Sequence, residues 1–180
     1  MPADLRVQAR ANATAGAELI SLVSPSSHHV TFRTRAPLPA RVLLSYYRRA
    51  QRRFGVPWQI LAAVNNVESR FGRVISASSA GAQGPMQFIP ATWSAYGLGG
   101  DVHDPLDAIM GAANYLHASG SPGDNAGALY HYNPASAYVN AVMLYARQMM
   151  KDPRSFYAYY NWQVFVLTPS GFKQLTGPRS

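Results

Sequence analysis

The chain has 180 residues, of which 48% are hydrophobic, and it contains no cysteine. This length suits one domain with extensions. The lack of cysteine excludes a disulfide scaffold, a zinc ribbon and a thiol nucleophile. The five histidines are scattered along the sequence, so we expect neither a metal site nor a cofactor.

The net charge of +8 is concentrated near the start of the chain. Residues 1–53 hold nine arginines and only two acids, whereas residues 54–180 are nearly neutral. Such a basic region either binds polyanions, such as nucleic acid, anionic lipid head groups or the phosphate-bearing polymers of a cell wall, or is a solvated arginine-rich face. No apolar run approaches the ~20 residues that cross a bilayer, so we expect no transmembrane segment. No secretory signal is visible either.

Residues 1–37 are rich in Ala, Ser, Thr, Pro and Arg with weak periodicity, which predicts a flexible basic extension or linker. The first folded element is an amphipathic helix over residues 39–54, which Gly55 ends. Residues 72–84 are rich in glycine and serine and predict a loop. Apolar stripes and capping residues predict four further helices, over residues 57–71, 105–117, 125–130 and 138–149. Asp104 is expected to cap the second of these helices, and Asp124 or Asn125 the third.

These elements predict a mainly α-helical domain over residues 38–165 with minor irregular or β segments. Only residues 162–168 alternate like a strand. Residues 166–180 are expected to form a C-terminal tail. We expect the protein to be a monomer.

Glu68 is one of only two glutamates in the chain, and it lies within the predicted helix over residues 57–71. At about 100° per residue, it falls within roughly 50° of the centre of the apolar stripe. Desolvation disfavours a charged carboxylate, so burial predicts a raised pKa and an acid that can donate a proton near pH 7. Proton donation to the leaving oxygen is what cleavage of a glycosidic bond requires. Alternatively, Glu68 pairs with Arg70, Arg73 or a distant arginine and only stabilises the fold.

Small and polar residues follow Glu68 along the chain. Residues 76–84 are short side chains and glycines, which let backbone amides approach a ligand closely. Gln87 then places an amide where it can contact sugar hydroxyls or an acetamido group. A loop of this composition is weak evidence for a binding site when taken alone.

Three motifs in this order resemble the lytic murein transglycosylases of the lysozyme-like superfamily. They are Glu68-Ser69-Arg70-Phe71-Gly72, the run that contains Ser78, Gly81, Ala82, Gly84, Met86 and Gln87, and the pair Tyr132-Asn133. Residues 84–93, together with residues 104–109, are most similar to the actinobacterial membrane-bound lytic transglycosylase B type. The resemblance covers about residues 38–165.

The resemblance implies a lysozyme-like helical domain with a glycan cleft that cleaves the β-1,4 bond between N-acetylmuramic acid and N-acetylglucosamine in peptidoglycan. Glu68 matches the family's catalytic glutamate, which acts first as acid and then as base while the C6 hydroxyl attacks C1 and forms a 1,6-anhydromuramic end. Such a substrate implies an extracytoplasmic location, in the cell wall or secreted. The positions that match substrate-binding residues of the family are Ser78, Met86, Gln87, Tyr132 and Asn133.

Alternatives remain open at the level of the sequence. A hydrolytic muramidase of the same fold would leave reducing ends, and a non-catalytic wall-binding or assembly module would keep the fold without the reaction. Ser78 can be a turn hydroxyl, and Tyr132-Asn133 before Pro134 can be a helix-ending turn. We expect no nucleic-acid partner, because the aromatic residues of the arginine-rich 39–54 helix belong to its apolar stripe.

Overall fold

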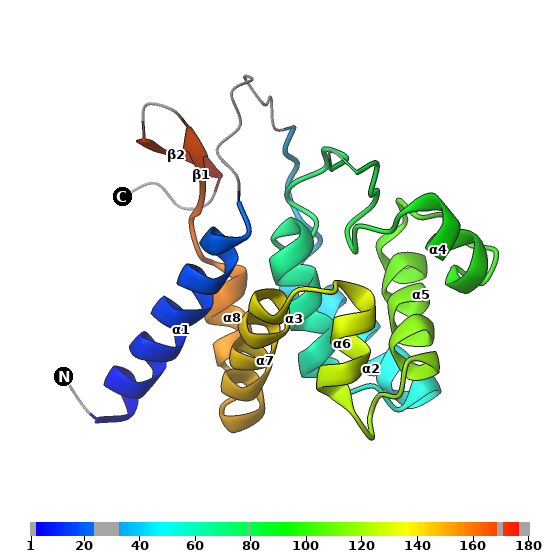
Figure 1. Cartoon of the computed structure of the whole chain (residues 1–180), viewed down its shortest axis with the longest axis horizontal. Coiled ribbons are helices and arrows are strands. Elements are labelled where there is room, and N and C mark those ends of the chain that lie inside the picture. Colours follow the sequence, from blue (N-terminus) through cyan, green and yellow to red (C-terminus); the bar gives the residue numbers. More distant parts are fainter. Residues whose placement is uncertain (1–2, 24–32, 79, 169–170, 177–180) are drawn as a thin grey trace.

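The structure is a computed structural model that describes residues 3–23, 33–78, 80–168 and 171–176. The first four helices in this part of the chain are α1 (Ala3–Ser21), α2 (Ala40–Phe54), α3 (Trp58–Ser69) and α4 (Pro90–Tyr96). The other elements are α5 (Pro105–Ala118), α6 (Asn125–Tyr132), α7 (Ser136–Lys151), α8 (Ser155–Tyr160), β1 (Val164–Thr168) and β2 (Gly171–Thr176). The domain is therefore mainly α-helical, as the sequence predicts (Figure 1).

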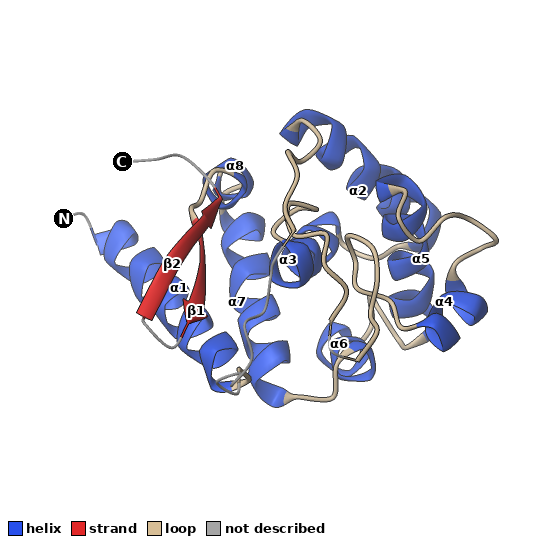
Figure 2. Cartoon of the chain, turned by 90° about the horizontal axis from the view of Figure 1, so that it is seen from above, coloured by secondary structure: helices blue, strands red, loops and turns tan. Residues whose placement is uncertain are grey.

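The α3 helix lies in the middle of the domain, where it contacts α2, α5, α7 and α8 (Figures 1 and 2). Nine of its twelve residues are buried. A helix that is apolar on nearly all sides is covered on nearly all sides. Its last turn therefore presents side chains from inside the core, which is the setting of Glu68.

The capping residues predicted from the sequence are confirmed. The α2 helix ends where Gly55 takes the left-handed conformation, with φ of 75°. The Asp104 side chain accepts hydrogen bonds from two backbone N–H groups in the first turn of α5. Asp124 accepts one in the same way at the start of α6. These bonds satisfy backbone donors that the helix itself leaves without partners.

The prediction of a flexible extension over residues 1–37 is wrong for residues 3–21, which form α1. This helix packs against α7, and Ala15 is fully buried. The Tyr159 hydroxyl donates to the Asn12 side-chain oxygen across 2.9 Å. Alanines and polar contacts contribute to this packing. The α1 sequence therefore shows no stripe of large apolar side chains, which is the pattern that predicts a packed helix. The remainder of the predicted extension lies partly outside the described residues.

The strand predicted near the C-terminus is confirmed as β1, but the prediction of an irregular tail after it is wrong for residues 171–176. Those residues form β2, which pairs antiparallel with β1. Backbone pairing with β1 defines β2, whose own sequence shows no alternation of apolar and polar residues. The other residues of the predicted tail after Thr168 lie outside the described part of the chain. None of the described helices is long and apolar enough to cross a membrane.

Residues 72–78 and 80–84 lie in the predicted loop, and Gly84 fixes its last turn. Gly84 has φ of +72°, and a Cβ added there would overlap the backbone carbonyl oxygen of Val102. The Gly84 carbonyl accepts hydrogen bonds from the backbone nitrogen of Gln87 (3.1 Å) and from its side-chain nitrogen (3.0 Å). The backbone that carries Met86 and Gln87 thus depends on a position that only glycine fits.

We predict that Gly84→Ala destabilises the fold much more than Gly81→Ala. Both glycines have positive φ, but nothing lies within 4 Å of a Cβ built on Gly81. Gly81→Ala should therefore cost only the left-handed strain of about 1–2 kcal/mol. Gly84→Ala should add about 1–3 kcal/mol from overlap with Val102. Urea unfolding of both variants measures the difference, and equal losses would contradict this account of the turn.

Candidate active site

Glu68 lies in the last turn of α3 with a half-buried side chain. One of its carboxyl oxygens accepts a hydrogen bond from the Tyr138 hydroxyl at 2.7 Å. Tyr138 belongs to the first turn of α7 and is itself buried. The acid is thus held between two helices of the core, as its place in the apolar pattern predicts.

Burial raises the pKa of Glu68 from 4.5 to about 7. Desolvation is the larger effect, because a half-buried carboxylate loses much of the water that stabilises its charge. The hydrogen bond from Tyr138 acts in the opposite direction and lowers the pKa, since it stabilises the charged form. The net result confirms the expectation of a raised pKa: near neutral pH both protonation states are populated.

The neighbouring arginines do not neutralise Glu68. The Nη1 atom of Arg70 contacts the backbone and side-chain oxygens of Asn66, at 3.3 and 3.4 Å. Arg73 donates to the Arg70 carbonyl at 3.2 Å and lies over the Tyr160 ring at 4.6 Å from its centroid. Pairing with Arg70 or Arg73, the alternative that the sequence left open, is therefore wrong.

The end of α3 is tied directly to the turn that follows Gly84. The Pro85 carbonyl accepts hydrogen bonds from the Asn65 side chain at 2.7 Å and from the Ser69 hydroxyl at 2.6 Å. Asn65 and Ser69 are buried polar groups, and such groups must find partners. The Glu-Ser pair in the motif therefore has a physical basis, because the serine holds the glycine loop against the helix that carries the acid.

Tyr132 and Met86 join this arrangement from α6 and from the turn. The Tyr132 hydroxyl donates to the Met86 carbonyl at 2.6 Å. Burial raises the pKa of Tyr132 well above its usual range, and the nearby charge of Glu68 raises it further. The Met86 side chain is fully buried in the core. The structure thus brings Glu68, Met86 and Tyr132 together, with the Met86 backbone carbonyl as the contacting group.

The other predicted site residues have local contacts. The Ser78 side chain is exposed, and its hydroxyl oxygen accepts a hydrogen bond from the Ala82 backbone nitrogen at 3.0 Å. Gln87 is half-buried, has φ of +52° and bonds to the Gly84 carbonyl. Asn133 is half-buried and ends α6. The predicted turn roles of Ser78 and Asn133 are thus present, and binding of substrate by these residues stays a prediction.

Tyr138 is the residue of this site that the sequence does not single out. Its spacing with Val142 and Tyr145 places it on the apolar stripe of α7, and burial of its ring confirms that interpretation. The hydroxyl contact to Glu68 joins residues 70 positions apart. No local pattern predicts such a contact. The only sequence feature that bears on this contact is a tyrosine in the first turn of a core helix.

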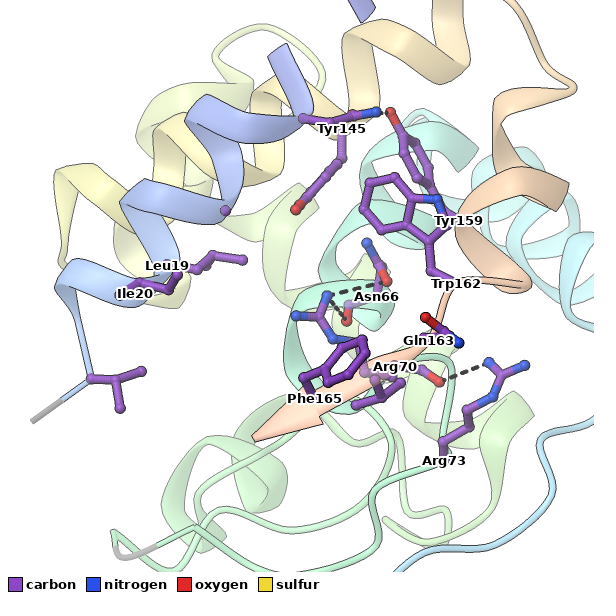
Figure 3. A pocket seen from close by; sticks show the side chains of 14 residues that line it. Leu19, Ile20, Asn66, Arg70, Arg73, Tyr145, Tyr159, Trp162, Gln163 and Phe165 are labelled. Atoms are coloured by element: carbon purple, nitrogen blue, oxygen red, sulfur yellow. Dashed lines mark hydrogen bonds between the residues drawn. The ribbon is translucent and has the colours of Figure 1, made fainter. Parts of the chain in front are cut away.

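Glu68 lines neither of two well-defined cavities in the described part of the chain. The larger cavity lies on another side of the α3 end and is shown in Figure 3. The predicted glycan cleft around Glu68 stays a prediction. Within the described residues, no group of three or more His, Asp or Glu side chains is placed to hold a metal ion.

A raised-pKa acid at the end of a central helix, in a mainly α-helical domain, is what the resemblance to lysozyme-like glycan-cleaving enzymes implies. Residues 45–153 match the transglycosylase SLT domain family. This match spans more than half of the chain. The chain therefore belongs to the transglycosylase SLT domain family and is a peptidoglycan lytic transglycosylase.

The fold is similar to those of solved lytic transglycosylases. The Escherichia coli lytic transglycosylase SLT35, solved in complex with bulgecin A and in complex with calcium, matches with a TM-score of 0.55 over 82% of both chains. A 36 kDa muramidase/transglycosylase matches with a TM-score of 0.54 over 76% of this chain and 79% of the other. At 16% sequence identity in each case, these likenesses show the lysozyme-like fold alone. No curated protein sequence matches the chain significantly.

We predict that Tyr138→Phe raises the pKa of Glu68 by about one pH unit, because it removes a hydrogen bond that stabilises the carboxylate. NMR titration of the Glu68 carboxyl carbon measures this change. Tyr132→Phe is the matched control, since the Tyr132 hydroxyl bonds to the Met86 carbonyl and not to Glu68. An unchanged or lowered pKa in Tyr138→Phe would contradict the role given to its hydroxyl.

Proposed function

We propose that the protein cleaves the β-1,4 bond between N-acetylmuramic acid and N-acetylglucosamine without consuming water, with Glu68 as the single general acid and then base. The observation that carries this proposal is the pKa of Glu68, which burial raises to about 7. A general acid-base group works best when its pKa lies near the working pH, because both protonation states are then accessible.

The surroundings of the other acids support a mechanism with one carboxyl group. Most glycosidases use a second carboxylate as base or nucleophile. Beyond residue 53, every acid other than Glu68 has a local role as helix cap, turn acceptor or ion-pair partner; these acids are Asp101, Asp104, Asp107, Asp124 and Asp152. These local roles fit a reaction in which the substrate itself, and not a second carboxylate, supplies the second catalytic group.

The proposed reaction moves one proton out of Glu68 and one back. Protonated Glu68 donates its proton to the bridging oxygen as the bond from that oxygen to C1 breaks. The acetamido carbonyl of the muramic residue stabilises the positive charge that develops at C1. Glu68, now a carboxylate, takes the proton of the C6 hydroxyl while that oxygen bonds to C1. The products are a free hydroxyl on N-acetylglucosamine and a 1,6-anhydromuramic end.

Tyr138 acts as a positioning residue in this scheme. Its hydroxyl fixes one carboxyl oxygen of Glu68 and leaves the other for the substrate. The bond also stabilises the carboxylate formed midway through the reaction. The pKa therefore reflects a balance: burial favours the acid that starts the reaction, and Tyr138 favours the base that completes it.

The proposed substrate-binding residues fall into two groups. Ser78, Gln87 and Asn133 supply polar side chains at the surface of the loop and at the end of α6. Tyr132 and Met86 form the support, because the Tyr132 hydroxyl holds the Met86 carbonyl and thereby the turn that presents Gln87.

The remaining proposals follow from the substrate and the charge. Peptidoglycan as substrate places the enzyme outside the cytoplasmic membrane, and residues 84–93 support a closer relation to the actinobacterial membrane-bound lytic transglycosylase B type. The arginines of α2 are exposed and favour contact with anionic wall polymers, at Arg41, Arg48, Arg49, Arg52 and Arg53. Binding of such polymers that does not weaken with salt would contradict this contact.

We predict that Glu68→Gln lowers the release of soluble glycan from purified sacculi by at least about 100-fold, because an amide cannot donate the proton. Mass analysis of the wild-type products should show anhydro ends, each one water lighter than a hydrolysed end. The matched control is Glu18→Gln, the same change at the other glutamate, whose carboxyl oxygen accepts a hydrogen bond from Asn140 at 3.1 Å. Its activity should equal that of the wild type.

Each other outcome of this experiment identifies an alternative. Reducing ends without anhydro ends would indicate a hydrolytic muramidase of the same fold. Absence of release by the folded wild-type protein, together with binding to sacculi, would indicate a wall-binding or assembly module. Release by Glu68→Gln at the wild-type rate would remove Glu68 from the chemistry.

A further inference from the structure

A cavity of about 430 Å³ lies between α1, the end of α3, α7, α8 and β1. Its volume falls within the roughly 300–1,000 Å³ that is typical of small-molecule sites. The described lining residues include no acid, whereas Arg70 and Arg73 both contribute to the wall (Figure 3). The cavity is therefore electropositive on its polar side.

Asn66 gives this wall an unused hydrogen-bond donor. Its side chain is 1% exposed, and its amide nitrogen is the one buried side-chain polar atom without a partner among the described residues. The amide oxygen faces the Arg70 guanidinium, as Figure 3 shows, and a flipped amide would set two donors against each other. A buried donor left without a partner costs about 1–3 kcal/mol, and a small movement of the Asn66 side chain that exposes this nitrogen to the cavity would let a ligand supply the acceptor.

Arg70 lies beside this donor and has no carboxylate partner among the described residues. Its described contacts are the oxygens of Asn66 and the hydroxyl of Tyr145, which opposes the effect of burial on the Arg70 pKa. Burial lowers that pKa, so an anion next to the guanidinium would restore the charge stabilisation that water supplies elsewhere. An arginine and an amide N–H₂ on one wall match the two oxygens of a carboxylate.

The other walls are mostly apolar, with Asn12 and Gln163 as their polar residues, and several of the apolar side chains are exposed. Trp162 is 37% exposed, Phe165 49% and Ile20 53%. Tyr145 and Tyr159 add two further ring faces. A contiguous apolar surface open to water indicates a binding site. The cavity thus pairs a small cationic, donor-rich end with a larger hydrocarbon surface.

We propose that this cavity binds a small organic anion that carries a carboxylate on an apolar body. The carboxylate lies against Arg70 and, once the Asn66 side chain turns its amide nitrogen toward the cavity, accepts a hydrogen bond from it, while the apolar body covers Trp162 and Phe165. The same chemistry occurs in aliphatic and in aromatic acids, and the experiment below distinguishes them.

The site is separate from Glu68. Asn66 lies in the last turn of α3 and Arg70 directly follows the helix, and the two side chains contact each other at 3.4 Å. Glu68 bonds to Tyr138 and does not line the cavity. The proposal therefore does not rest on the glycan-cleaving function.

Isothermal titration of the full chain with decanoate and 2-naphthoate tests the proposal, with decanamide and 2-naphthamide as neutral partners. Decanoate is used below the concentration at which it forms micelles. At least one carboxylate should bind with 1:1 stoichiometry, at least tenfold more tightly than its amide. Binding of decanoate alone would identify an aliphatic ligand, and binding of 2-naphthoate alone an aromatic one. Absence of binding by both, or equal affinity for acid and amide, would overturn the proposal.

Point variants test whether the carboxylate binds in this cavity. Arg70→Gln should weaken carboxylate binding at least tenfold, whereas Arg49→Gln, the same charge change on the exposed side of α2, should leave it unchanged. Ile20→Glu adds a negative charge at an exposed wall position, so it should weaken binding without touching the arginines or the core. Glu68→Gln should bind as the wild type does. Loss of binding in Glu68→Gln, or no loss in Ile20→Glu and Arg70→Gln, would place the ligand elsewhere and overturn the proposal.

Discussion

The burial of one carboxyl group at the end of α3 is the constraint on which the site depends. Two effects compete at Glu68: desolvation raises its pKa, and the hydrogen bond from Tyr138 lowers it. Desolvation is the larger effect, so the group titrates near pH 7 instead of near 4.5. Either effect alone would produce a worse catalyst, because a carboxyl group that is always charged cannot donate and one that is always neutral cannot accept.

The local backbone explains how a core helix can end at a functional site. After Ser69, three successive residues take positive φ: Arg70 at 52°, Phe71 at 61° and Gly72 at 79°. Left-handed conformations are costly for residues other than glycine, so the surroundings must enforce them. Phe71 is buried in the core, and the Ser69 hydroxyl accepts from the Gly72 nitrogen at 2.9 Å. The chain thus turns away sharply after Ser69. Side chains on two sides of the last turn of α3 are therefore not covered by a further helical turn.

Those two sides carry different chemistry. One presents Glu68 toward Tyr138, and the other presents Asn66 and Arg70 toward the cavity beside α1 and β1. Both depend on α3 being enclosed by its neighbours, because enclosure raises the pKa of Glu68 and leaves the Asn66 amide without water. A single buried helix end therefore positions an acid and, in our proposal, a separate receptor for an organic anion.

Local sequence patterns predicted the parts of this arrangement that depend on neighbouring residues. Helical periodicity placed Glu68 on a buried face, and side-chain chemistry indicated Asp104 as one helix cap and Asp124 or Asn125 as another. The hydroxyl of Tyr138 was not predicted, because its contact depends on how α7 packs against α3. In the same way, α1 is held by small and polar contacts that leave no apolar stripe, and β2 is defined by pairing with β1.

The cavity was not predictable for the same reason. Its walls come from segments at both ends of the chain and from the middle, and they meet only after folding. In the sequence, Asn66 is an ordinary polar residue of a predicted helix. Its proposed role depends on the burial of its amide nitrogen without a partner, which is a property of the tertiary structure.

The pH dependence of stability tests the central claim most directly, since it measures the coupling between the fold and the Glu68 proton. The folded chain binds that proton up to about pH 7, and the unfolded chain releases it near 4.5. The contribution of Glu68 to stability must therefore fall as pH rises through this range. Urea unfolding of wild type and Glu68→Gln should show the wild type losing stability relative to the variant between these pH values, with a constant difference above them. A difference that does not change across that range would contradict the claim that the fold holds Glu68 protonated.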